Sequence, residues 1–98
     1  MDFKIVWTLR TREDLRDIAT FISKDNPPAA LKLVDQIFAR VDSLEQFPEL
    51  GRVVPERNQP HIREIVVKPY RIVYRVHLKE KFLEILRVWH AARGEPEI

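Results

Sequence analysis

The chain has 98 residues, 45% of them hydrophobic, and a formal net charge of only +2. This length and hydrophobic content support one modest core in a single domain spanning residues 1–98, and they are too small to enclose an organic cofactor. It contains no cysteine, which excludes disulfide bonds and thiolate zinc sites and fits a reducing compartment. No apolar run approaches the ~20 residues that span a bilayer, and the N-terminus MDFKIVWT lacks the pattern of a secretory signal, so we expect a cytoplasmic protein without membrane contact.

The charge is distributed unevenly between the two halves. Residues 1–50 carry seven Lys and Arg against nine Asp and Glu, whereas residues 51–98 carry ten against six. The positive field therefore belongs to the second half, which favours an anionic partner modestly.

The first elements are a strand and a helix. Phe3, Ile5 and Trp7 alternate with Lys4, Val6 and Thr8, which predicts a strand. Thr11 is the expected N-cap of the helix that follows, with Glu13 and Asp14 in its first turn, where carboxylates meet the positive helix end. The apolar stripe of this helix consists of Leu15, Ile18, Ala19 and Ile22.

A second helix follows the segment Lys24–Pro28, which ends the first because proline lacks an amide donor. Proline is tolerated in the first turn of a helix, and we expect this one to run to about residue 46. Its apolar side consists of Ala30, Leu33, Val34, Ile37, Val41 and Leu44. The result is an antiparallel helical hairpin, closed by residues 47–51 with Gly51 in a left-handed or tight turn.

The last third predicts three strands, near residues 61–67, 70–77 and 82–89, after a polar loop over residues 52–60. The expected fold is α+β: an N-terminal strand and a two-helix antiparallel hairpin packed on one face of a small, mainly antiparallel sheet, with the other face free. Four arginines can collect on the sheet and point outward towards phosphates or carboxylates: Arg63, Arg71, Arg75 and Arg87.

Several motifs occur in an order that covers almost the whole chain. They are Asp25-Asn26-Pro27-x-Ala29-Ala30, Phe47-Pro48-x-x-Gly51-Arg52, Ile62-Arg63-Glu64, Tyr70-Arg71-Ile72-x-Tyr74-Arg75-Val76 and Val88-x-His90-x-x-Arg93. In this order and spacing the chain resembles the RelE/ParE superfamily of toxins from bacterial type II toxin–antitoxin modules, which also act in plasmid stabilisation.

The resemblance implies one of two toxic activities. RelE-type relatives are endoribonucleases that cut messenger RNA on the ribosome, and ParE-type relatives poison DNA gyrase. Both are neutralised by a cognate antitoxin, which binds the toxin with its C-terminal part and promoter DNA with its N-terminal part. We expect neither a cofactor nor a metal ion in this chain.

For a metal-independent nuclease, the resemblance implies three catalytic residues. Arg71 matches the arginine that stabilises the transition state, His90 a C-terminal histidine able to act as acid or base near neutrality, and Glu56 the general base, with Glu49 as a rival. The candidate contacts to nucleic acid or another target are Arg52, Arg57, Arg63, Lys68, Arg75 and Arg93.

Structural roles are open for the same residues. Arg71 could pair with Glu84 or Glu64 inside the sheet, and His90 could cap the last strand. Tyr70 and Tyr74 alternate with the arginines and are expected in the core.

Three functions therefore stay open. The modest charge, the long helical hairpin and the lack of a lysine cluster favour a ParE-like toxin that contacts gyrase, through the hairpin and residues 94–98. A RelE-like endoribonuclease is the alternative, and a non-toxic partner-binding domain is the third.

Overall fold

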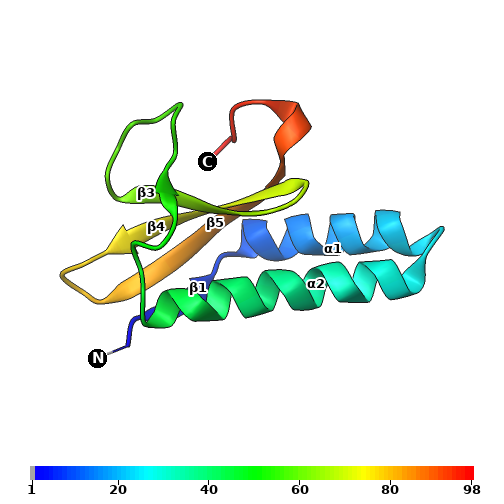
Figure 1. The fold of residues 1–98 in the computed structure, drawn as a ribbon, viewed down its shortest axis with the longest axis horizontal. Helices are drawn as coiled ribbons and strands as arrows, with labels where there is room; N and C mark the ends of the chain where they lie inside the picture. Colours follow the sequence, from blue (N-terminus) through cyan, green and yellow to red (C-terminus); the bar gives the residue numbers. More distant parts are fainter. Residues whose placement is uncertain (1) are drawn as a thin grey trace.

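The computed structural model describes residues 2–98, and these form a helical layer and a sheet (Figure 1). The elements follow in the order β1 (Lys4–Trp7), α1 (Leu9–Ser23), α2 (Pro27–Asp42), the 3₁₀ turn η1 (Ser43–Glu45), β2 (Arg52–Val53), β3 (Ile62–Val67), β4 (Tyr70–His77), β5 (Phe82–His90) and the 3₁₀ turn η2 (Ala91–Arg93). The predicted α+β fold is confirmed, including the N-terminal strand and the helical hairpin. The short strand β2 lies in the segment expected to be a loop.

The five strands form one mixed sheet with the order β1-β5-β4-β3-β2. The first strand lies beside the last and runs parallel to it, while all other pairs are antiparallel. Between β4 and β5, Val73 pairs with Arg87 and Tyr74 with Ile85, so Leu86 is an extra residue in a β-bulge. The bulge places Leu86 and Arg87 together beside the start of α1.

Helix α1 begins earlier than predicted. Its N-cap is Thr8, whose side-chain oxygen accepts a hydrogen bond from the backbone nitrogen of Thr11 at 3.3 Å. The hydroxyls of Thr8 and Thr11 both donate to the carbonyl oxygen of Ile85, at 2.6 and 2.7 Å. The assignment of Thr11 as N-cap is therefore wrong: it is a buried residue that ties the first turn to β5, and Asp14 lies beyond that turn.

The main core lies between the helices and one face of the sheet. Helix α2 buries Ala30, Leu33, Ile37 and Val41, at the predicted helical spacing. From the sheet, the apolar side chains of one face meet them: Ile65, Val67, Tyr70, Ile72, Tyr74, Val76, Leu83, Ile85 and Val88. Each large side chain buried here stabilises the fold by about 1.5–3 kcal/mol relative to exposure. Tyr70 and Tyr74 are core residues, as predicted.

The opposite face of the sheet is covered as well, contrary to the prediction. The connection between β2 and β3 and the segment after β5 both lie over it, on the side away from the helices (Figure 1). Val54 of that connection packs with Ile62 and Val73 in a second apolar cluster. Arg71 and Arg87 are only 6% and 5% exposed, so the expectation that they point outward into solvent is wrong. Buried carboxylates balance their charge.

Gly51 serves a different purpose from the predicted left-handed turn. Among the described glycines it is Gly94, not Gly51, that has a positive φ. A Cβ atom on Gly51 would lie 2.5 Å from the carbonyl oxygen of Glu64 and 2.7 Å from the hydroxyl of Tyr74. That hydroxyl accepts from the Gly51 nitrogen and donates to the Pro48 oxygen, both at 2.9 Å. Gly51 is therefore required for close approach to β3 and β4.

Candidate functional site

Glu64 is the centre of a buried ion-pair network on the far face of the sheet. Its side chain is fully buried and accepts from Nε of Arg52 and Nε of Arg71, both at 2.7 Å. Arg52 lies directly opposite Glu64 in the β2–β3 pair, and this register places the two side chains in contact. The predicted pairing of Arg71 with Glu64 is confirmed. Glu84 lies instead beside Arg75, at 3.6 Å, and His77, at 2.6 Å.

Glu56 holds the outer edge of the Arg71 guanidinium. Its two carboxylate oxygens accept from Nη2 at 2.7 Å and from Nη1 at 3.1 Å, and Nη1 also donates to the carbonyl oxygen of Gly94 at 3.0 Å. The hydrogen bonds from Arg71 lower the pKa of Glu56 from 4.5 to about 2, and the hydrogen bond to Glu56 raises the pKa of Arg71. Both groups are therefore charged at neutral pH.

An open hollow of about 540 Å³ lies beside this pair. It is lined by Arg52, Glu56, Val66, Lys68, Pro69, Arg71 and Ala91. Arg52 keeps 60% of its side chain exposed, and Lys68 is exposed at the β3–β4 turn. The hollow thus combines cationic groups with apolar walls, which suits an anionic group on an apolar stem.

His90 lies on the other side of the sheet. It pairs with Tyr70 in the β4–β5 ladder and contacts the tyrosine ring edge-on, with centroids 5.2 Å apart, whereas Arg71 pairs with Trp89. Neighbouring residues of a strand point to opposite faces. Nδ1 of His90 accepts from the backbone nitrogen of Ala92 at 3.1 Å, so this residue caps the turn η2. The structure brings Arg71 and Glu56 together but not His90, whose catalytic role stays a prediction.

The remaining candidate contact residues are scattered. Arg63 donates to the carbonyl oxygens of Pro60 and Gly51, at 3.0 and 2.9 Å, and braces the β2–β3 connection. Arg93 stacks on the ring of Trp89, 3.9 Å from its centroid. Arg57 is exposed on the loop. None of these three residues lines the hollow that Arg52 and Lys68 line.

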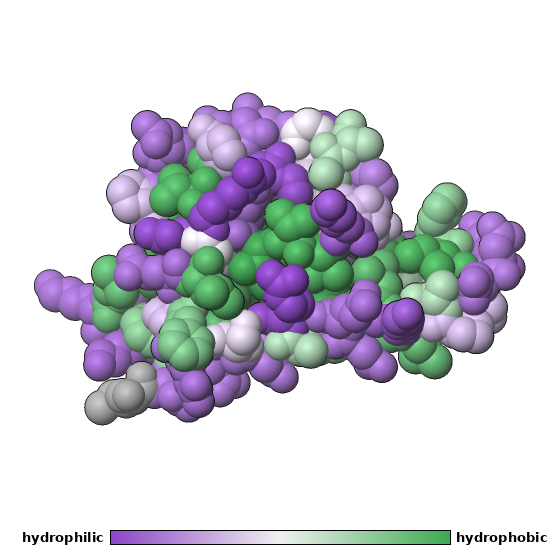
Figure 2. Space-filling model, in the orientation of Figure 1, coloured by the Kyte–Doolittle hydropathy of each residue, from purple (hydrophilic) through white to green (hydrophobic). Residues whose placement is uncertain are grey.

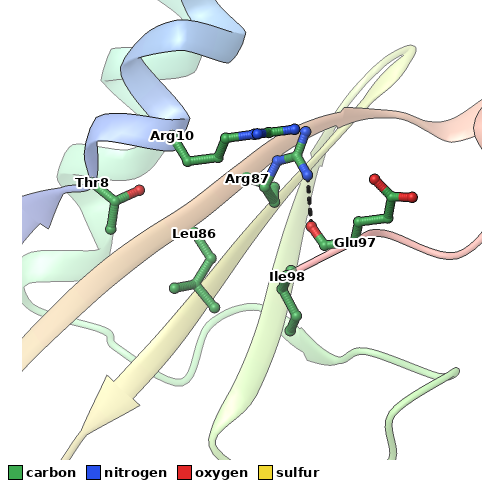
Figure 3. A pocket seen from close by; sticks show the side chains of 6 residues that line it. All are labelled: Thr8, Arg10, Leu86, Arg87, Glu97 and Ile98. Carbon is green, nitrogen blue, oxygen red and sulfur yellow. Dashed lines mark hydrogen bonds between the residues drawn. The ribbon is translucent and has the colours of Figure 1, made fainter.

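A second buried ion pair was missed from the sequence. Arg87 donates from Nε and Nη2 to Asp14 of α1, at 2.8 and 3.1 Å, and Asp14 also accepts from the backbone nitrogen of Val88 at 3.0 Å. Nη1 of Arg87 donates to the carbonyl oxygen of Glu97 at 2.8 Å (Figure 3). The helix, the last strand and the C-terminal segment are thereby joined. Helical spacing does not reveal this pair, because its members lie 73 positions apart.

Arg87 of this second pair also lines another hollow, of about 430 Å³ (Figure 3). Its lining is Thr8, Arg10, Leu86, Arg87, Glu97 and Ile98. The carboxylate of Glu97 points away from Arg87 in Figure 3, so the contact is made by its backbone alone.

The helical hairpin carries exposed apolar side chains. Phe21 near the end of α1 is 73% exposed and Leu31 near the start of α2 is 68% exposed. Figure 2 shows hydrophobic surface over the end of the hairpin that projects beyond the sheet.

Neither a metal-binding cluster nor a membrane span is found within residues 2–98. There, no group of three or more His, Cys, Asp and Glu is placed to hold a metal ion, and neither helix is long and apolar enough to cross a membrane.

The chain matches the family model of the ParE toxin of the type II toxin–antitoxin system parDE over residues 5–94. It is 39% identical over 97 residues to a toxin candidate of Sinorhizobium fredii named Y4kP, covering 97% of this chain and 95% of that protein. It is 33% identical over 90 residues to toxin RelE2 of Caulobacter vibrioides, covering 92% and 97% of the two chains.

Solved structures agree with these matches. A structure of the chromosomal ParDE system of P. aeruginosa superimposes with a TM-score of 0.71 and 27% identity, over 90% of this chain and 95% of the other. A double mutant of E. coli RelE in the free state shares the fold with a TM-score of 0.71 at 15% identity, over 96% and 88% of the two chains. The chain therefore belongs to the ParE toxin family, within the RelE/ParE superfamily of type II toxin–antitoxin toxins.

Proposed function

We propose that the protein is a ParE-like toxin that poisons DNA gyrase by protein contact and is neutralised by a cognate antitoxin in the cytoplasm. One observation carries the choice between the two activities of the superfamily. The candidate acid or base His90 lies on the face of the sheet opposite to Arg71 and Glu56. In addition, the buried guanidiniums of Arg71 and Arg87 are held by internal carboxylates.

The helical hairpin supports a protein target. Phe21 and Leu31 expose more than two thirds of their surface near its projecting end, and aromatic side chains such as that of Phe21 are enriched in protein interfaces. The solved RelBE2 complex of Mycobacterium tuberculosis pairs a relative with an antitoxin, and a cognate antitoxin that also binds promoter DNA is the expected partner here.

The test combines two readouts on the same protein. Purified toxin is added to gyrase and relaxed plasmid, and total RNA is followed after induction in cells. We expect loss of supercoiling or trapped double-strand breaks, with messenger RNA intact. Leu31→Ser should weaken gyrase inhibition. Leu9→Ser is the matched control. Leu9 is also a strongly exposed leucine, at 71%, but it lies at the start of α1, at the opposite end of the hairpin from Leu31.

A RelE-like ribosome-dependent endoribonuclease is the second candidate. The pairing of Arg71 with Glu56 beside a hollow flanked by Arg52 and Lys68 supports it. This function predicts rapid cleavage of messenger RNA that His90→Ala abolishes without loss of antitoxin binding. A non-toxic partner-binding domain predicts instead that expression without the antitoxin causes no growth arrest.

A further inference from the structure

The guanidinium of Arg71 has an inner and an outer edge with different neighbours. On the inner edge, Nε donates to Glu64, whose side chain is fully buried. On the outer edge, Nη1 and Nη2 donate to Glu56, whose side chain is 32% exposed and lines the open hollow. Glu64 therefore holds Arg71 in place independently of Glu56, and the outer edge keeps its geometry if Glu56 leaves.

Glu56 can leave without unfolding the loop that carries it. The loop is anchored by Val54, which is 1% exposed and whose carbonyl oxygen accepts from the backbone nitrogens of Arg57 and Asn58. These anchors do not involve the Glu56 side chain, so a rotation of that side chain into solvent is enough to vacate the site. The charges of Arg52, Lys68 and Arg71 would then be opposed by Glu64 alone, and the hollow would attract an anion.

We propose that Glu56 is an internal substitute for a carboxylate of a protein partner, and that this partner's acidic side chain displaces Glu56 from the outer edge of Arg71. The incoming carboxylate takes the two hydrogen bonds that Glu56 now accepts. Its apolar stem lies against Val66 and Pro69, with Lys68 at the rim. The inference rests on the proposed action by protein contact and adds the chemistry that the partner must present.

The lining favours a carboxylate over a phosphodiester. The present occupant is a planar carboxylate bound through two nitrogens, at 2.7 and 3.1 Å. Val66, Pro69 and Ala91 form apolar walls, which would lie against the hydroxyls and charges of a sugar-phosphate chain. Arg52 and Lys68 are the other cations of the lining, fewer than the row that a nucleic-acid backbone requires.

The experiment is an anion titration of the toxin alone, so its outcome does not depend on any gyrase assay. Glu56→Ala and the unaltered protein are titrated at pH 7 and constant ionic strength. The carboxylate ligands are propionate and a capped Leu-Glu-Leu-Glu-Leu peptide, and the same peptide with Gln in place of Glu is the neutral comparison. The phosphate ligands are inorganic phosphate and oligouridylate. The Arg71 Nε–H resonance is followed by NMR. Glu49→Ala is the charge-matched control, because Glu49 is 56% exposed and lies 3.6 Å from Arg63 rather than Arg71.

We expect Glu56→Ala to bind propionate and the acidic peptide at least about tenfold more tightly than the unaltered protein and Glu49→Ala do. The Gln-containing peptide should bind no more tightly to the variant than to the unaltered protein. Glu56→Gln keeps the side-chain volume and should show the same order of preference if the alanine variant is unstable. Tighter binding of phosphate or oligouridylate than of the carboxylates would overturn the inference in favour of a phosphodiester. Equal carboxylate binding by all variants, or none, would overturn it altogether.

Discussion

Replacing Glu64 by glutamine should destabilise the protein more than any other change of one carboxylate to its amide. The side chain is fully buried and accepts from Arg52 and from Arg71, itself 6% exposed. The amide keeps the shape but removes the charge, and it turns an NH₂ group towards one of the guanidiniums. Loss of one partner from a buried ion pair costs ~3–5 kcal/mol. Because Glu56 and the Gly94 carbonyl still hold the outer edge of Arg71, we expect the lower end, about 3 kcal/mol.

The assay is urea unfolding followed by circular dichroism and tryptophan fluorescence. A domain of this size has a total stability of ~5–15 kcal/mol, so the loss should lower the urea midpoint strongly and the melting temperature by more than ~10 °C. Glu84→Gln is the matched control. The carboxylate of Glu84 is 28% exposed, beside Arg75 and His77, so its replacement should cost at most ~1 kcal/mol. Equal losses for the two variants would show that the buried network does not stabilise the far face.

Further predictions concern the loss of stability at low pH, the close approach at Gly51 and the second ion pair. Because Arg71 holds the pKa of Glu56 near 2, below its ordinary 4.5, the contribution of Glu56 to the free energy of unfolding should be constant above ~pH 5 and fall by about 1–2 kcal/mol between pH 4.5 and 2, screened by solvent; in urea titrations Glu56→Gln should lack this part of the slope. Gly51→Ala should cost about 2–3 kcal/mol in thermal melts, because its Cβ would lie 2.5 Å from a backbone oxygen; an unchanged melting temperature would contradict the close approach. Tyr74→Phe removes the hydroxyl that holds Pro48 and Gly51 and should cost about 1–2 kcal/mol by urea unfolding. Asp14→Asn should cost about 2–3 kcal/mol in the same assay, and a neutral result would mean that its pair with the buried Arg87 is not stabilising.

Local patterns predicted the elements well, because each element carries its own signal. The spacing of Leu33, Ile37 and Val41 is helical, and the buried face of α2 follows from it. Alternation likewise placed Tyr74 in the core and Arg71 on the other face of β4. The predicted ends of the elements were less accurate: Thr8 and Thr11 are equally suitable caps by residue type, and only the hydrogen bond from the Thr11 backbone nitrogen to the Thr8 side chain identifies Thr8 as the cap.

The covering of the far face could not be read from the sequence. Periodicity shows that Arg71 lies on that face but does not choose between Glu64 and Glu84 as its partner or reveal Glu56, and a free face was the simplest expectation. Glu56 lies in a connection without a periodic pattern, and Asp14 is 73 positions from Arg87. Such contacts depend on tertiary packing, which a one-dimensional pattern does not encode. The opposed positions of His90 and Arg71 do follow from strand alternation, once the register of β5 is known.

The parallel pairing of β1 with β5 has a consequence for biosynthesis. Thr8 and Ile85 are hydrogen-bonded although 77 positions separate them, and ribosomes add ~5–20 residues per second. The amino-terminal strand therefore waits on the order of 4–15 s for its neighbour to be made. A cell that makes this toxin has that interval before the molecule can complete its sheet, and a truncated translation product that ends before β5 would lack the strand that joins the two ends of the chain.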